Sequence, residues 1–224
     1  MFENLKIIGT SHISNQSVRQ IKSGFSKFNP DYVAVEIDRK RFLALIYKKN
    51  SKPSFKNLKQ IGFSGFLFLI IGGYVQKKLG SIVGVEPGSD MKTAINLAKE
   101  KNLPLVFIDQ DIEITLKRFS KAFTLKEKIT LLKEIFFGRK LKLKFDLTKV
   151  PDKKTIKTLL NYFKTNYPGI FSVLIDERNK FMAKKLFKFM RDKKEKRILC
   201  VVGAGHEEGL KKEMEKYFYS NTSL

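Results

Sequence analysis

The chain has 224 residues and a formal net charge of +23 at pH 7, with 45 lysine and arginine residues against 22 acidic ones. This length suits a single domain, which we expect to span 1–224 with helical insertions near 50–80 and 120–165. The lone cysteine, Cys200, excludes a disulfide framework and a cysteine-based zinc site. Its place in the apolar run ILCVV predicts a small core residue.

The positive charge is mostly lysine, because only eight of the basic residues are arginine. Charge of this kind predicts a solvated surface that attracts anionic lipid or nucleic acid without specificity. The sequence has no zinc-finger, RRM or KH pattern, so specific nucleic-acid binding is not expected. It also lacks a Sec signal pattern, and its most apolar stretch, 61–75, is shorter than a spanning helix needs. We expect a cytoplasmic protein that buries this stretch, with association at a membrane surface as the alternative.

Short apolar runs rich in β-branched residues alternate with amphipathic segments along the chain. The apolar runs predict strands, in chain order at 5–9, 31–37, 103–109 and 196–203. The amphipathic segments predict helices, in chain order at 15–28, 39–49, 53–80, 89–102, 111–123, 124–137, 152–165, 168–192 and from 206 onward. Ser14 and Ser89 are the expected N-caps of two of these helices, and another helix is expected to start near Asp111. The clearest loop is 138–154.

Alternation of strands and helices predicts an α/β fold, with a small, mainly parallel sheet of about four strands flanked by many helices. The carboxyl ends of parallel strands share one edge, where such sheets bind ligands. Several polar residues follow the predicted strands directly: His12, Glu36, Asp109, Asp111 and His206. We therefore expect residues far apart in the sequence to meet at this edge.

The only two histidines of the chain occupy matched motifs, Gly9-Thr10-Ser11-His12 and Gly203-Ala204-Gly205-His206. A glycine three residues before each histidine lets the chain turn out of its strand. Two imidazoles with a carboxylate suit a divalent metal such as zinc, manganese, cobalt or iron, which could activate water. Glu36 would be the third ligand or the general base. Without a metal, His12 could be a base that Glu36 orients. The alternative is a pair of structural histidines.

Other polar residues are weaker candidates for this site. Asp109 and Asp111 could equally be a helix N-cap and a first-turn acid. Glu177 and Arg178 both flank an apolar helix face, so they could line the site or form a buried structural pair. Arg118 could hold an anionic intermediate or a substrate carboxylate, or could pair with a neighbouring acid.

Six blocks in order make the sequence similar to the TraB family, named for a pheromone-shutdown protein, and to its archaeal members in particular. They cover nearly the whole chain: GTSHIS, PDYVAVEID, GVEPGSDMKTAI, DQDIEITLKR, LIDERNKFMAKKL and VVGAGHEEGL. The chain departs from the family pattern at Gln110, where arginine is expected, and at Asn179, where aspartate is expected.

The resemblance implies a function as well as a fold. TraB proteins are grouped with GumN-like and Tiki proteins, and more distantly with erythromycin-esterase-like and ChaN-like proteins. Tiki proteins look like metal-dependent proteases that use paired Gly-x-x-His motifs and a glutamate, which His12, Glu36 and His206 match here. The resemblance thus implies a metal-dependent hydrolase of the peptidase kind, with Arg118 or Arg178 holding the substrate or oxyanion and Glu177 in a matching block. Because ChaN-like relatives bind haem iron, a noncatalytic protein that binds a peptide, haem or a partner is the alternative.

Overall fold

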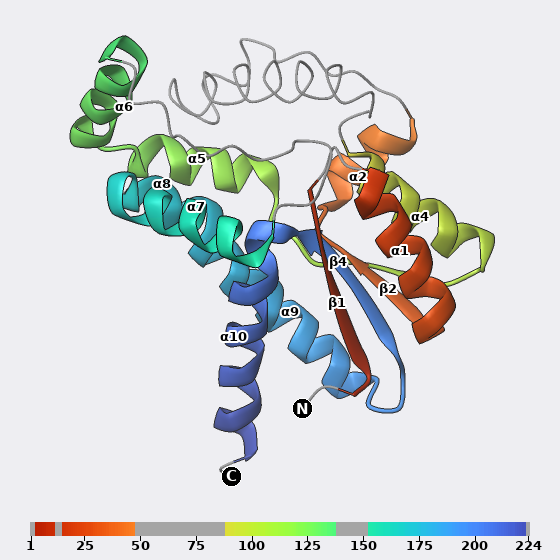
Figure 1. Ribbon diagram of the computed structural model, residues 1–224. Coiled ribbons are helices and arrows are strands. Elements are labelled where there is room, and N and C mark those ends of the chain that lie inside the picture. Colours follow the sequence, from red (N-terminus) through yellow and green to blue (C-terminus); the bar gives the residue numbers. More distant parts are fainter. Residues whose placement is uncertain (1–2, 12–14, 48–87, 138–151, 223–224) are drawn as a thin grey trace.

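The computed structural model of the protein describes residues 3–11, 15–47, 88–137 and 152–222. The predicted helix at 53–80, the apolar stretch at 61–75 and most of the predicted loop at 138–154 lie outside these residues. The described part is mostly helical and contains a four-stranded parallel sheet, which confirms the expected α/β fold (Figure 1). None of its helices is both long and apolar enough to cross a membrane.

The sheet has the strand order β1-β4-β2-β3. Its strands are β1 (Leu5–Thr10), β2 (Tyr32–Val35), β3 (Leu105–Phe107) and β4 (Ile198–Gly203). The last strand in sequence therefore lies between the first two, and the register pairs Thr10 with Gly203. This pairing brings the two Gly-x-x-His segments to the same end of neighbouring strands.

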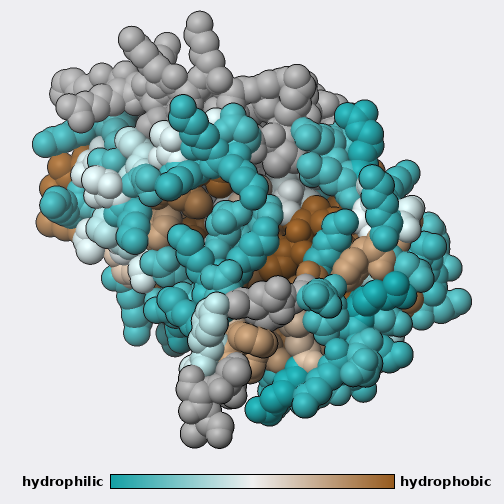
Figure 2. Space-filling view, turned by 60° about the horizontal axis from the view of Figure 1, so that its bottom comes forward, coloured by the Kyte–Doolittle hydropathy of each residue, from teal (hydrophilic) through white to brown (hydrophobic). Residues whose placement is uncertain are grey.

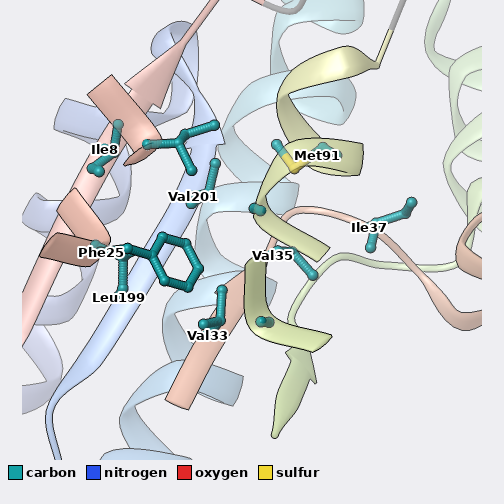
Figure 3. Packing of buried hydrophobic residues seen from close by; sticks show 11 residues of the cluster. Ile8, Phe25, Val33, Val35, Ile37, Met91, Leu199 and Val201 are labelled. Atoms are coloured by element: carbon teal, nitrogen blue, oxygen red, sulfur yellow. The ribbon is translucent and has the colours of Figure 1, made fainter. Parts of the chain in front are cut away.

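One face of the sheet is covered by helices from the first half of the chain, α1 (Asn15–Phe28), α2 (Arg39–Ile46) and α4 (Ser89–Glu100). Alternate strand residues point into this layer, among them Val33, Val35, Leu199 and Val201, and pack with Phe25 of α1 (Figure 3). Burial on both faces explains why the two central strands, β2 and β4, are apolar runs without polar gaps.

The opposite face is covered by α9 (Glu177–Asp192) and α10 (Ala204–Thr222). The other β4 side chains point this way, Ile198, Cys200 and Val202, and pack with Met182 and Leu186 of α9. Cys200 is fully buried, as predicted, and burial raises the pKa of its thiol above the usual range.

Beyond the carboxyl edge of the sheet lie further helices: α5 (Ile112–Ala122), α6 (Leu125–Phe137), α7 (Lys153–Asn166) and α8 (Pro168–Phe171). A small separate core joins α5, α7 and α8, and it is built on Phe119, Tyr167, Ile170 and Val173. The chain then passes through one π-helical turn, η1 (Ser172–Asp176), directly into α9. The predicted helix at 168–192 is therefore continuous but changes its winding just before Glu177.

Two predicted helix starts are wrong by a short distance. The N-cap of α4 is Gly88 and not Ser89, because Gly88 adopts a left-handed backbone conformation with φ of 78° that suits glycine. The last helix begins at Ala204, so His206 lies inside its first turn and not at its start. The start of α5, in contrast, lies where the sequence predicts it, and Asp111 caps this helix by accepting a hydrogen bond from the Glu113 amide at 2.8 Å.

Candidate functional site

Glu36 lies at the carboxyl edge of the sheet, directly after β2, and is only 7% exposed. Its amide donates to the Val201 carbonyl at 3.0 Å, which continues the pairing of β2 with β4. Its carboxylate turns toward the end of β4, where Oε2 accepts a hydrogen bond from the Gly203 amide at 2.6 Å. The first glycine of the second Gly-x-x-His motif thus holds Glu36 through its backbone.

Arg178 of α9 reaches the same place, and its five N–H groups have five acceptors there. Nε and Nη2 donate to the two carboxylate oxygens of Asp109 at 3.0 and 2.7 Å. Nη2 also donates to Oε1 of Glu36. Nη1 lies 3.0 Å from Nε2 of His206 and donates to the Leu174 carbonyl, in the π turn, at 3.3 Å. Every donor of this guanidinium is therefore used inside the protein.

The carboxylates of this cluster stabilise the positive charges of the arginines beside them. Burial lowers the pKa of Arg178, but the carboxylates of Glu36 and Asp109 outweigh this and raise it above the usual value. Asp109, 3% exposed, lies between two guanidiniums, since Arg41 of α2 also donates to its Oδ2. Burial likewise lowers the pKa of Arg41, and Asp109 and Asp38 raise it by more. The described side chains thus pair buried carboxylates with Arg178, which is mostly buried, and with Arg41, which is partly exposed.

His206 is 5% exposed and is held from both ring nitrogens. Nδ1 lies 2.8 Å from Oδ1 of Asn179, and Nε2 faces Arg178. An arginine can only donate, so Nε2 is the acceptor and Nδ1 carries the proton of the neutral ring. A Cβ atom on Gly209, one turn further along α10, would lie 2.1 Å from Nδ2 of Asn179, so this glycine leaves room for the asparagine.

The two described members of the expected metal-ligand set converge, because Nε2 of His206 lies 3.4 Å from Oε1 of Glu36. Their imidazole and carboxylate chemistry suits zinc or manganese. However, both atoms contact Arg178, whose charge stands where an ion bridging them would lie. In this arrangement the described residues do not fit a metal ion. His12, the other expected ligand, lies outside the described residues.

The remaining predicted site residues are spread around this cluster. Asp111 caps α5 and pairs with Lys40 at 2.9 Å, so it has the structural role that was its alternative. Arg118 pairs with Glu177 at 2.7 Å in an exposed contact, and neither side chain touches the buried cluster through a described bond. Gly9 lies at the edge of the sheet against Glu207, whose Oε2 would be 2.4 Å from a Cβ at that position.

Sequence reasoning missed roles for Asn179 and Arg41. Asn179 departs from the family pattern, but that pattern gives no sign that this residue, directly after Arg178, orients His206. Arg41 lies one turn after Asp38, which caps α2 by accepting a hydrogen bond from the Arg41 amide. This spacing in the sequence indicates a second guanidinium near the carboxyl edge of the sheet. No partner among the described residues is found for Nη1 of Arg41, so this group could contact a substrate.

Comparison with known proteins places these residues in a family context. The TraB/PrgY/gumN family model matches residues 3–216, almost the whole chain. The chain belongs to the TraB/PrgY/gumN family. An uncharacterized protein of Methanocaldococcus jannaschii is 37% identical over 215 residues, which cover 95% of this chain and 54% of the relative. TraB domain-containing proteins of Bos taurus and Homo sapiens are 22% and 21% identical over 234 residues.

The chain is shorter than these relatives. It spans 54% of the archaeal protein and 61% of each of the two mammalian proteins. The part of the chain that the family model matches, 3–216, contains both Gly-x-x-His motifs, Glu36 and Arg178, so the buried cluster lies within the segment that places this chain in the family.

Proposed function

We propose that this TraB-family chain is a hydrolase that acts on peptide-like substrates at the carboxyl edge of the sheet. The observation that carries the proposal is the buried contact of Glu36, Arg178 and His206 there. A buried ionic cluster is weak as a source of stability, because desolvation of the charges offsets their attraction. Its place where parallel sheets bind ligands favours a chemical role.

In this proposal each residue of the cluster has a different chemical role. Glu36 takes a proton from the attacking water, since the Gly203 amide and Arg178 fix the direction of its carboxylate. His206, held as the Nδ1–H form, presents its Nε2 lone pair to the same space. Arg178 positions both groups and has no donor left for a substrate, so Arg41 is the better candidate for binding an anionic group of the substrate or intermediate.

Metal dependence follows from the family resemblance and remains a separate proposal. A divalent ion held by His12, Glu36 and His206 would supply Lewis acidity and an activated water. Binding of this ion requires Arg178 to move away from Nε2 of His206 and Oε1 of Glu36, so we derive no reaction step that uses the ion. Binding of a peptide, haem or a partner protein without turnover is the alternative for the same residues. A cytoplasmic location and association with a membrane surface also stay predictions.

The test combines metal analysis with turnover. The full chain is purified without chelators, its metal content is measured by elemental mass spectrometry, and a peptide library is incubated with it under manganese, cobalt, zinc, iron or EDTA. Glu36→Gln and His206→Gln are the site variants, and Lys22→Glu on the exposed side of α1 is the control.

Turnover that both site variants lose and the control keeps would support the hydrolase. Near-stoichiometric metal lost in His206→Gln and in His12→Ala would add metal dependence to it. Turnover that survives in EDTA would instead assign the reaction to the side chains alone. If no peptide is cleaved under any condition while peptides bind, the hydrolase proposal is wrong and the binding alternative holds.

A further inference from the structure

A groove lies beside β1, the outer strand of the sheet next to β4. Among the described residues, β4 alone pairs with β1. The backbone carbonyl of Asn4 accepts a hydrogen bond from the Ile198 amide at 2.8 Å. This bond shows which backbone groups of β1 point toward β4 and which point away from it. Backbone groups alternate along a parallel strand, so those of Lys6, Ile8 and Thr10 face β4 and those of Leu5, Ile7 and Gly9 face outward.

Two residues of this outward row, Ile7 and Gly9, line a groove of about 500 Å³ between α1 and α10. Its floor includes Ile7, Ile8 and Gly9. The wall on α1 carries Gln16, Arg19, Gln20 and Ser23, and Glu207 of α10 closes the far end. Figure 2 shows apolar surface lying in a hollow between hydrophilic flanks on this side of the molecule.

Natural proteins usually block an outer strand with proline, a bulge or very short length. β1 has none of these: it is six residues long, contains no proline and keeps an unbroken register with β4. Charged side chains also protect outer strands, and β1 has one, Lys6, which disfavours a basic strand and favours an acidic one. An extended polypeptide could therefore add to it as a further strand, with main-chain hydrogen bonds to Ile7 and Gly9.

The charges along the groove select the kind of peptide. Lys6 and Arg19 line it, and no described residue forms an ion pair with either. Glu207, the acid at its end, is already neutralised by Lys211 at 2.6 Å. The groove therefore presents net positive charge to its occupant, which favours acidic side chains.

We propose that β1 is the docking strand for an extended, acidic polypeptide, which binds by adding a strand to the sheet. This inference rests on the proposed hydrolase function and names its substrate class. The groove ends at Gly9 and Glu207, and Glu207 directly follows His206 in the chain. A peptide lying along β1 would be guided toward the buried cluster at the carboxyl edge.

The probes are a soluble peptide of alternating threonine, valine and glutamate, and its counterpart with lysine at every glutamate position. Binding to the full chain is measured by fluorescence anisotropy, and protection of the Ile7 and Gly9 amides is followed by hydrogen exchange. The variants are Lys6→Glu and Arg19→Glu, and Lys22→Glu on the same helix, outside the groove, is the matched control.

We expect the acidic peptide alone to bind and to protect both amides. Lys6→Glu and Arg19→Glu, which reverse a charge in the groove, should each weaken the binding of the acidic peptide about fivefold, while Lys22→Glu changes this binding little. Equal binding of both peptides, no binding, unprotected amides or an unaffected Arg19→Glu variant would each overturn the inference. A dimer in sedimentation that Arg19→Glu dissociates would also overturn it, in favour of a second copy of this chain on β1.

Failure of the docking inference can be told apart from failure of the hydrolase proposal. Binding without cleavage that still depends on Arg19 would leave the docking strand intact and refute the hydrolase. Cleavage of peptides with no dependence on Arg19 or Lys6 would support the hydrolase and refute the docking strand.

Discussion

Asn179 fixes the imidazole of His206, because its Oδ1 lies 2.8 Å from Nδ1 on the side of the ring opposite Arg178. The asparagine comes from α9 and the histidine from α10, so the packing of these two helices sets the direction of the ring. Where a family member carries aspartate at this position, the partner of Nδ1 would be an anion. This chain instead uses a neutral acceptor, which leaves the ring without an added negative charge.

The space for this contact depends on Gly209, and Gly209→Ala should disturb it. The new methyl group would lie 2.1 Å from Nδ2 of Asn179 in the present arrangement, so the asparagine must move. We expect a loss of about 1–3 kcal/mol in the free energy of unfolding. We also expect the Nδ1–H signal of His206 to shift or broaden. Thermal unfolding and nitrogen-15 NMR of the two histidines measure these effects.

Gly205→Ala on the same helix is the control. A Cβ there would meet only Leu160 Cδ2, at 3.8 Å, which is ordinary contact. This variant should keep the His206 signal and gain up to about 1 kcal/mol from helix propensity. An unchanged His206 signal in Gly209→Ala would show that Asn179 does not depend on the glycine.

Arg178 and Arg118 allow a comparison of a buried and an exposed ion pair within one protein. Replacing Arg178 with methionine leaves Glu36 and Asp109 buried beside one fewer cation, so unfolding should become easier by about 3–5 kcal/mol. Arg118→Met breaks the contact with Glu177, in which the arginine side chain is 54% exposed, and should cost no more than about 1 kcal/mol. Chemical denaturation of the two variants gives both values. Similar losses in the two variants would contradict the structural difference between the sites.

Arg178→Met also tests the relation between the arginine and a metal ion. Because the guanidinium contacts both Nε2 of His206 and Oε1 of Glu36, its removal takes positive charge away from these two donors. We expect folded Arg178→Met to bind zinc more tightly than the parent chain, by about tenfold or more. Isothermal titration with zinc measures this, with circular dichroism as the check of folding. Equal or weaker zinc affinity in the folded variant would mean that Arg178 does not compete with a metal.

The strands and their polar ends could be read from the sequence, because buried parallel strands leave an apolar pattern that local composition reveals. The strand order could not, since nothing local places β4 between β1 and β2. The partners of Arg178 were equally hidden, as Glu36 is 142 positions away. The sequence spacing placed both Glu177 and Arg178 beside the apolar face of the helix. Their separation into an exposed and a buried pair depends on the tertiary contacts of α9, with the π turn immediately before them.

Thr10 joins the first Gly-x-x-His motif to α4, and Thr10→Val should show how much this matters. Its hydroxyl lies 2.5 Å from Oδ2 of Asp90 and 3.1 Å from the Val202 carbonyl, and Thr10 and Asp90 are each 1% exposed. Removing the hydroxyl takes one partner from a buried carboxylate, so we expect a loss of about 1–3 kcal/mol. Thr93→Val, which removes a hydroxyl that donates to the Ser89 carbonyl within α4, should cost about 1 kcal/mol or less. A larger loss in Thr93→Val, measured by chemical denaturation, would contradict this prediction.

Glu127 should make the stability of the helical region depend on pH. It is 2% exposed and forms a capping box with Thr124, and its Oε1 accepts the Gly169 amide of α8 at 2.7 Å. Burial raises the pKa of this carboxyl, but hydrogen bonds from Thr124, Ile170 and Gly169 outweigh it and hold the pKa below the usual value of 4.5. A lowered pKa means that the stabilising effect is present above that value and is lost as the pH falls through the folded-state pKa.

We therefore expect Glu127→Gln to lower the thermal midpoint at pH 7, since a neutral amide accepts these bonds less strongly. The difference from the parent chain should shrink as the pH falls below about 4, because protonation of Glu127 removes the same charge from the parent. Glu215→Gln, at an exposed position on α10, is the control and should follow the parent at every pH. Calorimetry across this range measures both variants. A Glu127→Gln difference that grows in acid would reverse the expected sign, and would mean that the carboxyl is held in its neutral form.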